Sequence, residues 1–111
     1  MRASSESKPR VVVAESPIHG RGIFARSRIR NSAVIGEFQG RPTRRNGHHV
    51  LWVTDDAGLQ VENELRFINH SESPNAEAHG TQLVAVRNIQ PGVEITMHYG
   101  DDWEQAPRTG V

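Results

Sequence analysis

The 111-residue sequence contains no cysteine. This absence excludes a disulfide framework and a thiolate zinc cluster, so packing alone must stabilise the chain, as suits a reducing compartment. The sequence also has no apolar run near the roughly 20 residues that span a bilayer, and its first ten residues, MRASSESKPR, lack the apolar core of a signal peptide. We therefore expect a soluble cytoplasmic protein, or a nuclear or chromatin-associated one if the source is eukaryotic or viral.

Net charge is absent too, because 13 basic and 13 acidic residues cancel. No stretch concentrates Lys and Arg densely enough for a phosphate-binding surface, and the arginines of residues 41–45 (RPTRR) are typical of a solvated loop. We expect neither direct nucleic-acid binding nor a membrane partner.

The length suits one small domain, with 35% hydrophobic and 23% charged residues. Such a domain buries roughly two thirds of its unfolded surface, which leaves little stability to spare, so a homodimer would help it. The first nine residues are polar and Ser-rich, a composition typical of a flexible tail. We predict a tail at 1–9, the domain at 10–104 and a second tail at 105–111.

Short β-branched runs separated by turn residues fill most of the domain. Pro91 and Gly92 suit a type II turn, and residues 63–69 have short helical character. The pattern predicts a mainly β domain. Strands are expected at residues 11–13, 23–25, 34–40, 83–86 and 93–99, with a hairpin joining 50–53 to 59–61.

Three segments far apart in the chain carry polar residues that a plain β domain would not need. They are residues 19–22 (HGRG), 69–75 (NHSESPN) and 98–100 (HYG). Singly, each is more typical of a tight turn, a polar loop or a strand end. Gly20 and Gly22 lack Cβ, however, so the backbone can adopt positive φ and approach a ligand closely.

Together and in this order, the segments resemble the SET-domain family, whose hallmarks are a GxG loop, an Arg-Phe-Ile-Asn-His-Ser-x-x-Pro-Asn segment and a Glu-Ile/Leu-Thr-x-x-Tyr-Gly segment. The matching residues are 19–25 (HGRGIFA), 66–75 (RFINHSESPN) and 94–100 (EITMHYG), with further matches at 36–40 (GEFQG) and 89–94 (IQPGVE). The resemblance covers about residues 10–103. It implies a minimal SET domain without cysteine-rich flanking regions, a mainly β (β-clip) fold of several short sheets with a threaded, knot-like C-terminal segment.

The resemblance further implies a protein-lysine N-methyltransferase that transfers a methyl group from S-adenosyl-L-methionine to a lysine side chain of a protein substrate. In the family the GxG loop holds the methionine end of this cofactor. The amide of Asn69 and the imidazole of His70 offer hydrogen-bond donors and acceptors for its amino-acid and adenine groups. The cofactor-binding residues expected here are Gly20, Arg21, Gly22, Asn69 and His70, joined by Trp103 as a candidate to stack on adenine or to close the lysine channel.

Tyr99 corresponds to the essential tyrosine of the family, whose hydroxyl points at the reaction centre; we expect it to be catalytic and to line the lysine channel. Phe38 stands where many members carry a tyrosine, so it would supply an aromatic channel wall without a hydroxyl. A lysine loses its proton more readily in an apolar channel beside a sulfonium cation, so the protein needs no strong base.

The sequence departs from the family in two respects. Glu72 replaces the common cysteine after Asn-His-Ser, and the cysteines that bind zinc after the domain are absent, so part of the lysine channel must come from elsewhere. A partner subunit or the substrate could supply it.

Two other functions compete with a methyltransferase. One is a non-catalytic SET-like protein-binding module that keeps the fold without turnover. The other is a metal-dependent hydrolase using His48, His49 and His70, but the sequence has no HxxxH or HxH spacing to support it. We expect no metal site.

Overall fold

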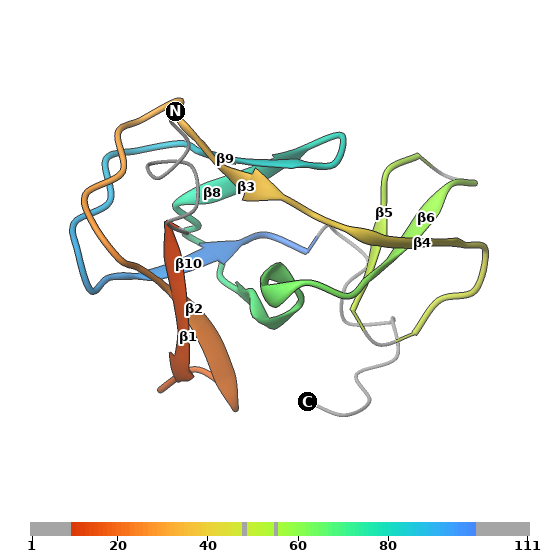
Figure 1. Cartoon of the computed structure of the whole chain (residues 1–111), viewed down its shortest axis with the longest axis horizontal. Helices are drawn as coiled ribbons and strands as arrows, with labels where there is room; N and C mark the ends of the chain where they lie inside the picture. Colours follow the sequence, from red (N-terminus) through yellow and green to blue (C-terminus); the bar gives the residue numbers. More distant parts are fainter. Residues whose placement is uncertain (1–9, 48, 55, 100–111) are drawn as a thin grey trace, which may run out of the picture.

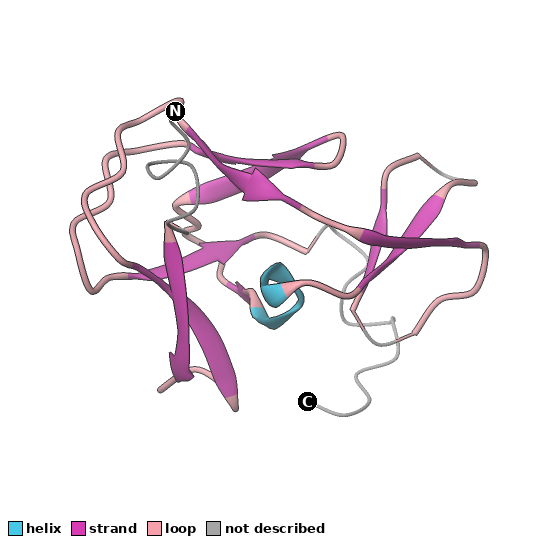
Figure 2. Cartoon of the chain, viewed as in Figure 1, coloured by secondary structure: helices cyan, strands magenta, loops and turns pink. Residues whose placement is uncertain are grey.

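A computed structural model describes residues 10–47, 49–54 and 56–99 of the chain. Short strands dominate it, as the sequence predicts, and Figures 1 and 2 show how they are arranged. The elements are β1 (Val11–Glu15), β2 (Arg21–Ala25), β3 (Val34–Glu37), β4 (Gly40–Thr43), β5 (Val50–Trp52), β6 (Gly58–Val61), the 3₁₀ helix η1 (Glu64–Phe67), β7 (Asn69–His70), β8 (Ala76–His79), β9 (Gln82–Ala85) and β10 (Glu94–Met97).

The strands form two sheets. The larger has the order β1-β2-β10-β8-β9-β3, with β7 pairing β10, and the smaller has the order β4-β6-β5. The smaller sheet lies at one end of the molecule, on the right in Figure 1, and the chain enters it directly from β3. The predicted strand at 34–40 is shorter than expected, because β3 ends at Glu37; a separate strand, β4, begins at Gly40 and pairs with β6 despite its polar sequence.

Most of the expected strands are confirmed, and η1 is a single 3₁₀ turn within the segment expected to be helical. The β5–β6 hairpin is antiparallel, as predicted. Gly92 has a φ of +85° and the N–H of Val93 donates to the carbonyl of Gln90, so residues 90–93 form the expected type II turn. The sequence prediction missed β7 and β8.

Strand β10 joins segments that lie far apart in the chain. It pairs antiparallel with β2 and parallel with both β7 and β8. Thr96 lies opposite Asn69, and Met97 opposite His70. The last strand is thus inserted between earlier ones, which confirms the predicted threaded arrangement and brings the Asn69 segment beside the Tyr99 segment.

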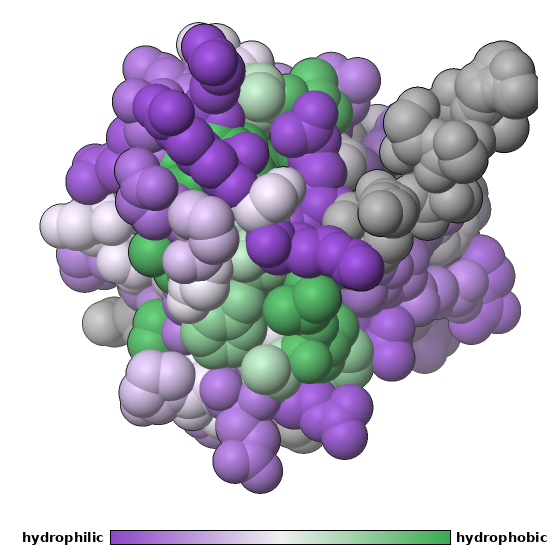
Figure 3. Space-filling view, turned by 60° about the vertical axis from the view of Figure 1, so that its left-hand side comes forward, coloured by the Kyte–Doolittle hydropathy of each residue, from purple (hydrophilic) through white to green (hydrophobic). Residues whose placement is uncertain are grey.

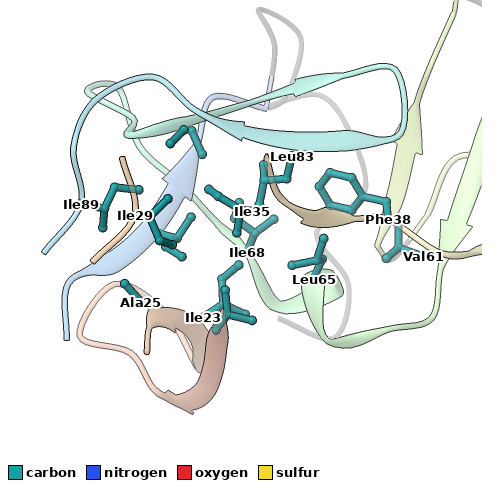
Figure 4. Close-up of a cluster of buried hydrophobic side chains, with 14 residues drawn as sticks. Ile23, Ala25, Ile29, Ile35, Phe38, Val61, Leu65, Ile68, Leu83 and Ile89 are labelled. Atoms are coloured by element: carbon teal, nitrogen blue, oxygen red, sulfur yellow. The ribbon is translucent and has the colours of Figure 1, made fainter. Parts of the chain in front are cut away.

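The hydrophobic core lies among the strands of the larger sheet and η1 and extends to Phe38 and Val61 (Figure 4). The loops before β3 and before β10 meet through an isolated bridge between Ile29 and Ile89, which are both almost fully buried. The largest fully buried side chains are those of Ile23, Ile29, Leu65, Leu83, Ile89 and Ile95. These residues come from strands, from loops and from η1. Ile95 of β10 is among them, so packing of the core fixes the strand that carries the polar site.

The surface of the larger sheet is mixed in character. Val12 and Val13 on the edge strand β1 are 42% and 37% exposed, and Figure 3 shows hydrophobic side chains among hydrophilic ones on the face it presents. The predicted homodimer stays a prediction. No helix within the described residues is long and apolar enough to cross a membrane.

Candidate active site

The loop between β1 and β2 is shaped by one serine and two glycines. The N–H of Ser16 donates to the carbonyl of Gly20 (2.8 Å), and the Ser16 hydroxyl oxygen accepts from the N–H of Ile18 (2.9 Å). Gly20 has a φ of +48°, as expected. Gly22 does not have a positive φ; it is needed because a Cβ there would overlap the carboxylate of Glu94.

Asn69 joins this loop to strand β10. Its side-chain nitrogen Nδ2 lies 3.2 Å from the carbonyl of His19, 3.1 Å from that of Arg21 and 2.9 Å from Oε2 of Glu94. It also lies 3.1 Å from the hydroxyl of Ser16. Because these neighbours are acceptors, they fix which end of the amide is the nitrogen.

The other end of the Asn69 amide has no hydrogen-bond donor among the described residues. The residue is only 6% exposed, yet its oxygen Oδ1 accepts no hydrogen bond from any described residue. A buried carbonyl oxygen without a donor is costly, so such an oxygen is commonly satisfied by a water molecule or a ligand. Asn69 therefore holds the loop and presents an acceptor to which no described residue donates.

Tyr99 follows β10, and its hydroxyl and its backbone N–H both bond to earlier segments. Although 44% of its surface is exposed, its hydroxyl turns inward and donates to the carbonyl of Ile68 (2.7 Å). Its backbone N–H donates to Nδ1 of His70 (2.9 Å). Burial raises the pKa of the Tyr99 phenol above its ordinary value, and the nearby charge of Glu94 raises it further. The phenol is thus a protonated donor at neutral pH, not a phenolate base.

His70 lies in a small polar cluster outside the GxG loop. Its Nε2 is 2.8 Å from one carboxylate oxygen of Glu72, and Nε2 of His98 is 3.3 Å from the other. The hydrogen bond from His70 lowers the pKa of the Glu72 carboxyl, and the charge of His98 lowers it too.

The ligand atoms of His70, Glu72 and His98 lie within 4.8 Å of one another, as in a metal site. Nδ1 of His70, however, accepts the N–H of Tyr99, so the proton of the neutral ring is on Nε2. A metal on Nε2 would displace that proton and leave two donors facing each other at Nδ1. The cluster is therefore better explained by hydrogen bonding.

The remaining predicted site residues lie in different places. Arg21 contributes its carbonyl to the Asn69 contact, while its guanidinium lies 5.9 Å from the ring centre of Phe67. Phe38 is 4% exposed and packs in the core near Val61 (Figure 4), so its contacts in the structure are those of a core residue. Trp103 lies outside the described residues, as do Gly100 and His48.

Two residues of the site were missed at the level of sequence. Glu94 belongs to the matched segment 94–100, but nothing local shows that its carboxylate reaches the GxG loop. Ser16 donates to that carboxylate (2.8 Å) from 78 residues away in the sequence. Only the pairing of β10 with β2 brings the two together.

Comparison with known proteins agrees with this arrangement. The family model of the SET domain matches residues 20–100. The chain is 27% identical over 119 residues to the Arabidopsis thaliana protein named histone-lysine N-methyltransferase MEDEA, an alignment that covers 85% of this chain but only 17% of that protein. A crystal structure of a candidate histone methyltransferase of Plasmodium falciparum has the same fold, with a TM-score of 0.70 at 19% identity over 87% of this chain and 98% of that one. The chain belongs to the SET-domain family.

Proposed function

We propose that this chain is a protein-lysine N-methyltransferase that uses S-adenosyl-L-methionine and binds it between the GxG loop, Asn69 and His70. The observation that carries the proposal is Oδ1 of the buried residue Asn69, an acceptor without a donor among the described residues, on a side chain whose other end holds the carbonyls of the GxG loop. The amino group of an amino-acid ligand is a donor of the type that this oxygen lacks.

The chain's own groups would divide the binding task. The amide of Asn69 holds the carbonyls of His19 and Arg21, which keeps the loop in one shape. The Nδ1 and Nε2 atoms of His70 both have partners inside the protein, so contact with adenine through the ring would displace Glu72. Contact between adenine and the backbone of His70 would leave the bond to Glu72 intact.

When bound, the cofactor supplies a methyl group on a positively charged sulfur. A lysine amine that has first lost its proton to solvent would accept this methyl group, forming N–CH₃ as S–CH₃ breaks and leaving the bond's electron pair on sulfur. Tyr99 would assist by position. Its hydroxyl donates a hydrogen bond to the carbonyl of Ile68, which fixes the direction of the phenol and so the place where its oxygen could orient the amine. Phe38 and Trp103 stay candidates for the channel walls.

The substrate is proposed from the relatives' names. Both are named as histone methyltransferases, so histone lysines are the first targets to test. The number of methyl groups added is left to the experiment.

The test is methyl transfer by the wild type and by Tyr99→Phe. Purified protein is incubated with labelled S-adenosylmethionine and with histones or a cell lysate, and labelled bands are identified by mass spectrometry. Tyr99→Phe keeps the ring but loses the hydroxyl, so we expect transfer to fall by about tenfold or more, at least about 1.4 kcal/mol of barrier, while cofactor affinity is kept. Cofactor binding without transfer to any protein would instead establish the non-catalytic binding module.

A further inference from the structure

We propose that Glu94 is a positioning residue whose negative charge makes the site prefer the charged methyl donor over its uncharged product. This inference rests on the proposed function, since it assumes that S-adenosylmethionine binds beside the GxG loop. It concerns a residue with no role in the reaction proposed above.

The first argument is the position of the carboxylate. Glu94 begins β10 and lies opposite Phe24 of β2, so its backbone is fixed by pairing. Its Oε2 is 2.9 Å from Nδ2 of Asn69 and occupies the space that a Cβ of Gly22 would need. The carboxylate thus lies against the loop that is proposed to hold the methionine end of the cofactor.

The second argument is the lack of a compensating cation. The carboxylate of Glu94 is partly buried and receives hydrogen bonds from the neutral donors Ser16 and Asn69. No ion pair joins it to a Lys, Arg or His among the described residues. A partly buried charge that has only neutral partners gains from a cationic ligand nearby.

The third argument is the effect on Tyr99. The charge of Glu94 reaches the phenol strongly enough to raise its pKa, in addition to the effect of burial. The ring centre of Tyr99 lies 5.1 Å from that of His70, which in turn contacts the ring of His98 and is bonded to Glu72. The charge of Glu94, which lies against the GxG loop, therefore acts as far as the Tyr99 hydroxyl.

The ligand chemistry gives this field a consequence. S-adenosylmethionine carries a sulfonium that S-adenosylhomocysteine lacks, whereas the ammonium and carboxylate are common to both. A fixed negative charge stabilises the sulfonium form selectively. After transfer the product loses this attraction, so Glu94 favours donor binding and product release.

The experiment measures the affinities of both ligands by calorimetry for the wild type and Glu94→Gln. The amide keeps the size of the side chain and removes its charge, so the ratio of donor to product affinity should fall by about threefold to tenfold. Glu77→Gln removes an exposed carboxylate of β8 that pairs with His79, away from the GxG loop. This control should keep the wild-type ratio.

A second readout needs no ligand. Tyr99 is the only tyrosine of the chain, so near-ultraviolet absorbance follows its ionisation alone. In Glu94→Gln the pKa of Tyr99 should fall toward its ordinary value, while Glu77→Gln should leave it unchanged. An unchanged affinity ratio in a folded Glu94→Gln variant would overturn the inference, even if the wild type binds and transfers as proposed. Wild-type protein that binds neither ligand would overturn the proposed function itself.

If Glu94→Gln does not fold, the inference can still be tested on the wild type alone. An S-adenosylmethionine analogue with a tertiary amine in place of sulfur is cationic only when protonated. Binding should then raise the pKa of this amine, seen as proton uptake when calorimetry is repeated in buffers of different ionisation enthalpy. Absence of uptake at a pH where the free analogue is largely neutral would contradict the inference.

Discussion

The GxG loop and the small β4-β6-β5 sheet both depend on a glycine that leaves room for a neighbour, but the neighbours differ. At Gly22 a Cβ would overlap the carboxylate tip of Glu94, and at Gly40 it would overlap the backbone carbonyl of Gln60. The first region is held by side chains from distant parts of the chain, and the second by strands that follow one another. A change at the loop should therefore alter ligand binding most, and a change in the small sheet should alter stability most.

Gly40→Ala should have the largest effect on folding. The new Cβ would meet the carbonyl carbon of Gln60 at 2.7 Å and the Cα of Val61 at 3.0 Å. Backbone atoms cannot rotate away, so β4 and β6 must separate, at a cost of about 3 kcal/mol in the free energy of unfolding. Urea denaturation of the wild type and Gly40→Ala measures this loss in the free energy of unfolding. A loss below about 1 kcal/mol would show that the small sheet yields more easily than this close approach implies.

Gly22→Ala should affect the site more than the fold. The carboxylate of Glu94 can swing aside, but its contacts with Ser16 and Asn69 then weaken. We expect a loss of about 1 to 2 kcal/mol of stability, together with about a tenfold loss of affinity for S-adenosylmethionine. If Gly22→Ala instead destabilised the protein as much as Gly40→Ala and left affinity intact, the contrast between the two regions would fail.

The alkaline stability curve should give the smallest effect. Because the pKa of Tyr99 is raised in the folded protein, the unfolded chain releases this proton first as the pH increases. The stabilisation is complete below the unfolded value of about 10 and is lost as the pH rises from there through the folded value. Thermal melting of the wild type and Tyr99→Phe over this alkaline pH range measures the loss of stability. The extra alkaline loss should be absent in Tyr99→Phe, and equal slopes would contradict the raised pKa.

The two regions also differ in how far the sequence predicts them. The hairpin of the small sheet is local, so turn residues between β-branched runs predicted β5 and β6 correctly. Strand β4 was missed because Arg41 is polar and Pro42 has no N–H to donate to a neighbouring strand. Only the pairing with β6 reveals this strand. Propensity is a weak guide where the pairing partner decides.

In the larger sheet, the motifs predicted that the Asn69 and Tyr99 segments would meet, and they do. The β7 strand has only two residues, too few for any periodicity, and β8 is the sequence AEAH, whose alanines and glutamate are uncommon in strands. The role of Glu94 could not be predicted either. It depends on a contact with Ser16 across most of the chain, which no local pattern encodes.

The measurement that tests the account most directly is the affinity of S-adenosylmethionine for the wild type and for Asn69→Ala, determined by calorimetry. The variant loses both the free Oδ1 acceptor and the amide that holds the loop, so we expect binding to weaken by about 1 to 3 kcal/mol, roughly fivefold to 150-fold. Asn63→Ala is the matched control, since the side chain of Asn63 bonds, among the described residues, only the backbone of Glu37 and Gln39 near β3. It should lose stability but keep the wild-type affinity. Equal affinity in wild type and folded Asn69→Ala, or no binding by the wild type, would contradict the assignment of this site.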